Sequence, residues 1–329
     1  MSIITLTSAG GAPGVSTLAR QLVVNNRRPT VLVDADPQGG TGQLTKLFGG
    51  FRRPNLGLID LLLAARAGRL AQAYPEALMA WPPATATASG AARWLLPGPT
   101  SHAQARSTLE LWPQLLSSWR RPSSDATHSC EPEPTSPKTS LPVSGAPRGR
   151  ETDPSRAWPP GSGLGLPTAT SADIIIDAGR LGSEFFPQDL IDQADLVILV
   201  AWPDLAGLIG ANQWIKIWQE RRLDRPELAD WRLLLAEGGQ GYSPSEITSS
   251  LGISLLRPGR ERHDFEHPGQ GSRLGESRRH WFTRRPIGIE WWPAIDAALD
   301  RPRSESLRHT VSSTPAASSP AAKESPHAS

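Results

Sequence analysis

The chain has 329 residues, of which 38% are hydrophobic, and its formal net charge at pH 7 is +2. So small a charge excess is no argument for nucleic-acid binding, and the single cysteine, Cys130, excludes an intrachain disulfide and favours a reducing, cytoplasmic location. The longest apolar runs fall far short of the roughly 20 residues that span a bilayer, so we predict a soluble protein.

Apolar, β-branched runs alternate with helical patterns along the chain. The predicted strands are, in order, residues 3–6, 30–34, 93–97, 173–177, 195–201 and 231–236, with 253–256 as a short last candidate. Helices are predicted at 16–25 and 56–68, and a capping box at Ser243 and Glu246 marks the start of a later one. Continuously apolar strands suit a sheet that is covered on both faces. The predicted fold class is therefore α/β, a doubly wound, mostly parallel sheet flanked by helices.

Two segments lack the large apolar residues that a core needs. Residues 121–170 are rich in Pro and Ser, and residues 300–329 contain no Phe, Trp or Tyr. Neither segment can bury enough surface to offset the entropy lost on ordering, so both are predicted to be disordered. Because strands are predicted on both sides of the first segment, we expect a single domain over 1–299 with 121–170 as an insertion.

A glycine-rich turn, SAGGAPGVST at residues 8–17, joins the first predicted strand to the first helix. Its small residues would let backbone N–H groups point at phosphate oxygens, and Ser16 and Thr17 would place hydroxyls at the start of the helix. Val15 stands where a phosphate-binding loop has a lysine. A tight turn that packs a helix on a sheet explains the stretch equally well.

Carboxylates follow two of the predicted strands. Asp34 and Asp36 end the strand in VLVDADPQGG on the same face, and Asp177 ends the strand in ADIIID. Carboxylates beside a phosphate loop can hold the water shell of magnesium and orient an attacking water molecule. The two patterns together favour a nucleotide site over a purely structural turn.

These motifs resemble the MinD/ParA-type P-loop ATPases, the deviant Walker A group of the SIMIBI class. The pattern D-x-D-P-Q-G is matched by Asp34 to Gly39, and the family's loop, G-K-G-G-x-G-K-[ST]-[ST], aligns without gaps on Ala9 to Thr17. Further likeness at 191–211 and 243–256 extends the resemblance over most of 1–120 and 170–299. It implies a P-loop NTPase-like fold and a homodimeric, nucleotide-dependent switch that positions chromosomes, plasmids, division sites or surface structures.

The resemblance also implies ATP and Mg²⁺ as cofactors and assigns roles to residues. Asp36 would be the catalytic residue of a slow Mg-dependent ATPase, if the chain hydrolyses ATP at all. The metal would be held by Ser16, Asp34 and Asp177. The nucleotide would be bound by Gly10, Gly11, Ala12, Pro13, Gly14, Val15, Ser16, Thr17 and Arg180.

Both lysines of the family's loop are replaced, by Gly10 and Val15. A hydrogen bond to a charged group contributes about 1.5–3 kcal/mol, so each loss would weaken binding roughly ten- to a hundred-fold. Arg180 could swing toward the phosphates or pair with Glu184, whereas Arg20 is expected to point away. The alternative function is therefore a non-catalytic scaffold that keeps the fold and the dimer surface.

Residues 257–285 hold eight arginines against four acidic residues. Surface arginines can contact DNA phosphates without sequence preference, so weak DNA binding through Arg257–Arg285 is one interpretation, and a solvated loop is the favoured one. The polar tail does not suit a membrane-seeking helix, and we expect no direct membrane insertion. No pattern identifies a protein partner.

Overall fold

The computed structural model describes nine stretches of the chain, which are residues 1–10, 14–38, 42–48, 54–82, 90–120, 172–236, 242–257, 259–260 and 289–300. The predicted disordered segment 121–170 lies outside these residues, and so does the predicted tail from residue 301 onward. Among the described residues, no helix is both long and apolar enough to cross a membrane.

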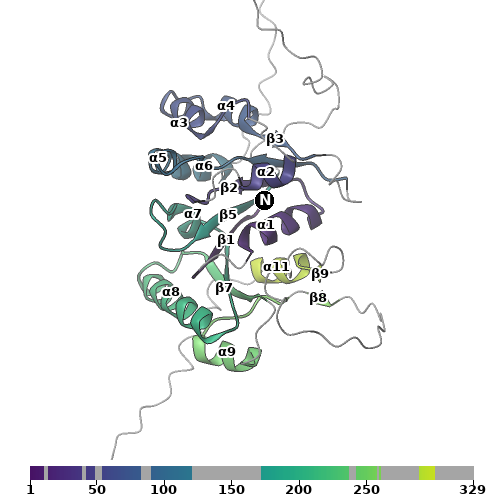
Figure 1. The fold of residues 1–329 in the computed structure, drawn as a ribbon, viewed down its shortest axis with the longest axis vertical. Coiled ribbons are helices and arrows are strands. Elements are labelled where there is room, and N and C mark those ends of the chain that lie inside the picture. The colour runs from purple at the N-terminus through teal and green to yellow at the C-terminus, as the bar shows by residue number, and fades with distance from the viewer. Residues whose placement is uncertain are drawn as a thin grey trace, which may run out of the picture.

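A seven-stranded sheet forms the centre of the structure (Figure 1). Its strands lie in the order β3 (Met79–Ala80), β4 (Arg93–Leu96), β2 (Thr30–Asp34), β5 (Asp173–Arg180), β1 (Ile3–Ser8), β6 (Leu196–Ala201) and β7 (Asp230–Leu235). Neighbouring strands are parallel except for β3 and β4, which pair antiparallel. The predicted fold class is confirmed.

The predicted short strand at 253–256 forms a single parallel bridge, between Leu255 and Leu233 of β7. The bridge is held by the Leu233 N–H to the Ser254 carbonyl at 3.0 Å and by the Leu256 N–H to the Leu233 carbonyl at 2.8 Å. A separate pair, β8 (Gly259–Arg260) and β9 (Ile289–Glu290), is antiparallel.

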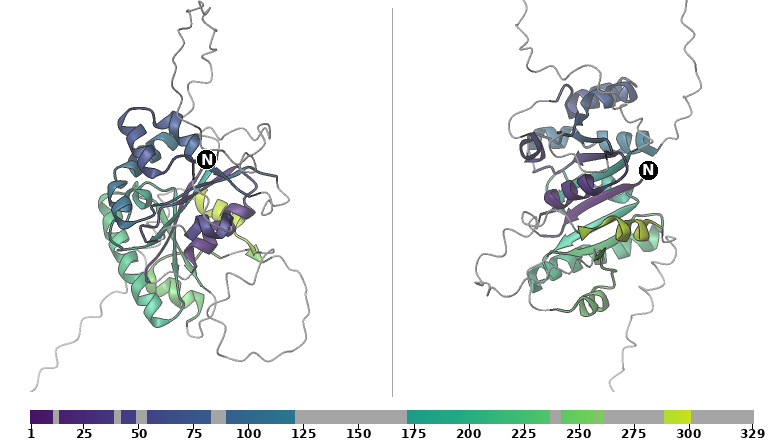
Figure 2. Two further views of the ribbon diagram at one scale, coloured as in Figure 1. Left: turned by 45° about the horizontal axis from the view of Figure 1, so that its top comes forward. Right: turned by 90° about the vertical axis from the view of Figure 1, so that its right-hand side faces the viewer.

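Helices cover both faces of the sheet, each packed on its own apolar cluster (Figures 1 and 2). One face, to the right in Figure 1, carries α1 (Val15–Asn25), α2 (Gly42–Phe48) and α11 (Trp292–Leu299). The other face carries α3 (Leu58–Arg66), α4 (Leu70–Ala77), α5 (His102–Ser107), α6 (Leu111–Arg120), α7 (Asp189–Asp192), α8 (Leu205–Asp224) and α9 (Pro244–Leu251). The predicted capping box begins α9, where Ser243 and Glu246 bond reciprocally.

The strand order joins the two halves of the sequence. β5 follows the long segment 121–171 in the chain but lies between β1 and β2 in the sheet. Since β4 precedes that segment and belongs to the same sheet, the strands on its two sides form one structure. This arrangement brings the ends of β1, β2 and β5 together.

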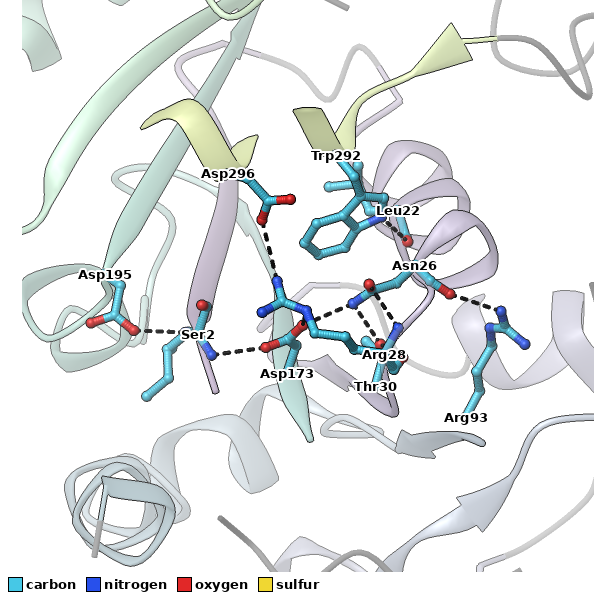
Figure 3. A network of polar contacts seen from close by, with 11 residues as sticks. Ser2, Leu22, Asn26, Arg28, Thr30, Arg93, Asp173, Asp195, Trp292 and Asp296 are labelled. Atoms are coloured by element: carbon cyan, nitrogen blue, oxygen red, sulfur yellow. Dashed lines mark hydrogen bonds and ion pairs between the residues drawn. The ribbon is translucent and has the colours of Figure 1, made fainter. Parts of the chain in front are cut away.

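A polar network fastens α11 to α1 at the amino edge of the sheet (Figure 3). Trp292 Nε1 donates to the Leu22 carbonyl of α1 at 3.1 Å. Arg28 pairs with Asp173, at the start of β5, at 2.8 Å and with Asp296 of α11 at 3.3 Å. The last helix is therefore tied to the helix that follows the glycine-rich turn.

Candidate functional site

The predicted carboxylates meet at the carboxyl edge of the sheet. Asp34, the last residue of β2, lies opposite Asp177 of β5 in the parallel register. Their side chains are buried, with exposed fractions of 3% for Asp34 and 1% for Asp177. Gly98, after β4, passes so close that a Cβ there would lie 2.4 Å from the Asp34 carbonyl oxygen. Only glycine fits beside Asp34.

Asp36 reaches the same place from the loop after β2. Its Oδ1 accepts a hydrogen bond from the Gln38 N–H at 2.9 Å, which forms a local turn. Gly179 of β5 has φ +69°, and a Cβ there would lie 2.3 Å from Asp36 Cγ. The Asp36 carboxylate therefore lies against β5, two residues beyond Asp177.

Helix α1 begins beside these carboxylates. Gly14 is its N-cap residue in the left-handed region, at φ 81°, and the Gly14 carbonyl accepts from Thr17 and Leu18 at 3.0 and 2.9 Å. Glycine has no side chain to cap the first N–H groups, so these stay available to an anion. The Ser16 hydroxyl bonds to the Asp177 carboxylate, which joins the helix start to the carboxylates.

Ser8 adds a buried hydroxyl at the end of β1. Side chains alternate along a strand, and Ile4 and Leu6 belong to the cluster under α1, so Ser8 faces α1 as well. Within the part of the chain that the structure describes, its Oγ is fully buried and has no hydrogen-bond partner. Such groups are uncommon in native proteins and are frequent at functional sites.

The buried carboxylates are electrostatically unfavourable as they stand. Burial raises the pKa of Asp34 well above its ordinary value, and the charges of Asp177 and Asp36 raise it further. Burial also raises the pKa of Asp177, and the hydrogen bonds from Ser16 and Gln43 oppose that shift. A bound cation would favour the ionised forms of both carboxyl groups.

Two residues of the site were not identified from the sequence. Gln43 of α2 donates from Nε2 to Asp177 Oδ2 at 2.8 Å and to the Ser16 carbonyl at 3.1 Å. Arg20 donates from Nη2 to Thr17 Oγ1 at 3.1 Å and from Nη1 to Gln43 Oε1 at 3.5 Å. The expectation that Arg20 points away is wrong, because residues three apart on a helix share a face. That spacing was the available signal, whereas nothing local indicated Gln43.

The structure places the other predicted loop residues in different surroundings. Val15, at the lysine position, is 1% exposed and packs in the apolar cluster under α1. Gly10 has open space around it, since a Cβ there would meet no atom within 4 Å. Arg180 is exposed at the end of β5, and its role at the phosphates stays a prediction. The residues between Gly10 and Gly14 lie outside the described residues; they are Gly11, Ala12 and Pro13.

The donor set fits magnesium through its water shell. Among the described residues, no group of three or more His, Cys, Asp or Glu side chains is arranged to hold a metal directly. Mg²⁺ keeps several waters and takes one or two carboxylates together with substrate phosphates. The bonded pair of Ser16 and Asp177, with Asp34 opposite, provides oxygen donors of that kind.

No protein-family model matches the chain, and no curated protein matches it. Among solved structures it is similar to a ParA family ATPase from Chlorobium tepidum, at 14% identity over 77% of this chain and 81% of that one, with a TM-score of 0.48. The cell division ATPase MinD of Pyrococcus furiosus is 16% identical over 78% and 82%, with a TM-score of 0.46. The septum site-determining protein MinD of Pyrococcus horikoshii, complexed with Mg-ADP, is 16% identical over 78% and 79%, also at 0.46. Likenesses this distant do not assign the chain to a family.

Proposed function

We propose that this chain is a divergent MinD/ParA-like ATP-binding protein, a homodimeric switch that helps to position chromosomes, plasmids, division sites or surface structures. The observation that carries the proposal is the convergence of Ser16 with Asp34, Asp36 and Asp177 at the carboxyl edge of the sheet. In open α/β sheets, ligands bind outside the carboxyl ends of the strands.

Binding would use main-chain and hydroxyl groups in place of lysines. Phosphate oxygens would accept from the N–H groups at the start of α1, where Gly14 allows close approach. The Ser8 hydroxyl under this turn would gain a partner when the phosphates order the site. Ser16 and Asp177 would hold Mg²⁺, which supplies positive charge to the phosphates when it is bound.

Hydrolysis, where it occurs, would depend on Asp36. Its carboxylate lies beside β5 and next to Asp177, where it could orient a water molecule toward the outermost phosphate. Turnover would be slow, because neither loop lysine is present to stabilise charge that develops in the transition state. The expected activity is that of a slow Mg-dependent ATPase.

The alternative is a non-catalytic scaffold that keeps the fold and the dimer surface. The observation that favours it is the burial of Val15, which fills the lysine position with a core side chain. A scaffold would also tolerate the cost of the buried Asp34 and Asp177 only if they served another purpose. The two functions therefore differ in one measurable property, the response to nucleotide.

The test is a titration of the full chain with ATP and MgCl₂, followed by melting temperature. A ligand at a hundred times its Kd stabilises a protein by about 2.7 kcal/mol, so a clear rise is expected. Ser16→Ala should weaken the response at least about ten-fold, because it removes a hydroxyl that bonds Asp177. Ser117→Ala, on an exposed face of α6, is the matched control. No response at millimolar Mg·ATP would exclude the switch and leave the scaffold.

The proposed partners need their own measurements. Sedimentation with and without Mg·ATP tests the homodimer, which should form when nucleotide is bound. Weak DNA binding stays a prediction, since Arg257 is exposed and nearly all the remaining arginine-rich segment lies outside the described residues. Binding to a random duplex that does not weaken between low and high salt would contradict phosphate contacts by these arginines.

A further inference from the structure

We propose that Arg20 is the phosphate-binding cation of the candidate nucleotide site and takes over, from the first helix, the task that the missing loop lysines would perform. This inference rests on the proposed nucleotide binding and names the group that makes it achievable. It also replaces Arg180, the cation that the sequence suggested, with a residue that the structure places inside the site.

The position of Arg20 follows from the helix. It lies three residues after Thr17 and four after Ser16, so its side chain runs along the face of α1 that carries both hydroxyls. Its guanidinium donates to Thr17 Oγ1 at 3.1 Å and to Gln43 Oε1 at 3.5 Å. Gln43 in turn bonds Asp177 at 2.8 Å. A chain of hydrogen bonds thus ties the guanidinium to the proposed metal-binding carboxylate.

The site has a charge problem that Arg20 is placed to reduce. Asp34, Asp36 and Asp177 are close enough for their charges to raise one another's pKa values, and a polyphosphate would add more negative charge. Burial lowers the pKa of Arg20, and the attraction of Asp177 opposes this only in part. The guanidinium is therefore a partly desolvated cation that its present neighbours do not fully compensate, and an incoming anion would stabilise it.

Arg20 also keeps donors for a ligand. A guanidinium has five N–H groups in a planar fork that matches phosphate oxygens in pairs. Among the described residues, the printed bonds of Arg20 to Thr17 and Gln43 use two of these N–H groups. A phosphate near the start of α1 could therefore bond the guanidinium while Thr17 and Gln43 continue to hold it.

The other cations near this edge are placed differently. Arg180 at the end of β5 and Lys46 in the last turn of α2 are both exposed. Exposed charges are screened by water and salt and contribute little to a fixed contact. Both residues are therefore suitable controls, because each removes one positive charge from the same edge without touching the hydrogen-bonded chain.

The test compares Arg20→Gln and Arg20→Lys with Arg180→Gln and Lys46→Gln in the full chain. Binding of Mg·ATP, Mg·ADP and AMP is measured by calorimetry, and melting temperature is measured without nucleotide. Arg20→Gln should weaken Mg·ATP binding roughly ten- to a hundred-fold. The loss should be smaller for AMP, which offers fewer phosphate oxygens. Arg20→Lys should restore part of the affinity, and the two control variants should bind as the unmodified chain does.

The outcomes separate this proposal from the function on which it rests. If the unmodified chain binds Mg·ATP and Arg20→Gln binds it equally well, the role of Arg20 is wrong and the nucleotide site stands. A loss that is equal for ATP and AMP, together with a lower melting temperature, would mean that Arg20 only holds Thr17 and Gln43. If the unmodified chain binds no nucleotide, both proposals fail.

Discussion

At the scale of single residues, the site is built from groups that are costly to bury. Asp34 and Asp177 face each other on neighbouring strands with little access to water. Buried carboxyl groups without a compensating cation lower stability, and proteins retain such arrangements mainly where activity needs them. The apolar neighbours on the same strands, in contrast, need only to pack. Substitutions at the carboxylates should therefore separate stability from binding.

Asp34→Asn should stabilise the nucleotide-free protein and abolish its response to Mg·ATP. The pKa of Asp34 is raised from 3.8 by burial and by Asp177 and Asp36, so the folded state binds more protons than the unfolded state above about pH 4. Stability contributed by this group is present at low pH and falls as pH rises through the folded pKa. The melting temperature of the variant should exceed that of the unmodified chain by about 2–4 °C at neutral pH, and by less near pH 4.

Asp224→Asn, at the exposed end of α8, is the control for that comparison and should change stability by less than about 0.5 kcal/mol. A variant at position 34 that melts lower than the unmodified chain at every pH would show that Asp34 serves the fold and not a ligand.

Gly179→Ala should displace Asp36, and Gly68→Ala is its matched control. Both glycines have φ +69°, so alanine carries the same left-handed strain, on the order of 1–2 kcal/mol, at each. Only at Gly179 does the new Cβ collide, at 2.3 Å from Asp36 Cγ, whereas nothing lies within 4 Å at Gly68. The larger loss, by about 1–3 kcal/mol, and the loss of any ATP hydrolysis should therefore belong to Gly179→Ala alone. Denaturant unfolding and phosphate release measure the two effects, and equal behaviour of the variants would contradict the placement of Asp36.

At the scale of elements, α1 connects the two edges of the sheet. Its first turn borders the candidate site, and its last turns bond to α11 through Trp292 and lie beside Arg28. The Arg93 guanidinium, from β4, donates to the carbonyls of Val23, Val24 and Asn26 at the end of the helix. A helix held at its carboxyl end in this way presents its amino end to the site in a defined position.

Arg28→Gln should be far more damaging than Asp296→Asn. Arg28 pairs with Asp173, which is 1% exposed, so the variant leaves a buried carboxylate without its ionic partner. Asp296 is 55% exposed, and water can replace its contact with Arg28. We expect a loss of about 2 kcal/mol, or roughly 4–8 °C in Tm, for Arg28→Gln, and less than about 1 kcal/mol for Asp296→Asn. Similar melting temperatures for the two variants would show that Asp173 does not depend on Arg28.

At the scale of the whole molecule, the fold depends on a strand from the second half of the chain. β5 pairs with β2 on one side and with β1 on the other, so residues 1–120 do not contain the strand that joins their own β1 and β2. Asp177 is carried by the same strand, and the candidate site is therefore incomplete without it. We propose accordingly that 1–299 is one domain with an insertion.

Limited trypsin digestion should cut first between residues 122 and 167, at Lys138, Arg148, Arg150 or Arg156. The two fragments should then co-elute in gel filtration and melt as one unit, because the pairings of β5 with β1 and β2 join them. Resistance to cleavage in this range would show that the segment is folded. Fragments that separate without denaturant would show that the sheet does not hold the halves together.

Patterns within short stretches of sequence were sufficient for the strands, the class of sheet, the capping box and the acidic residues of the site. Alternation, apolar runs and cap residues act over a few positions, so they are visible without knowledge of distant segments. The same patterns could not show that β5 inserts between β1 and β2, that Gln43 bonds Asp177, or that α11 packs on α1. Those features come from burial of side chains that lie more than a hundred residues apart or on different elements, and only packing in three dimensions selects among their arrangements. Arg20 lies between the two cases, since its helical spacing was visible but its partners from α2 were not.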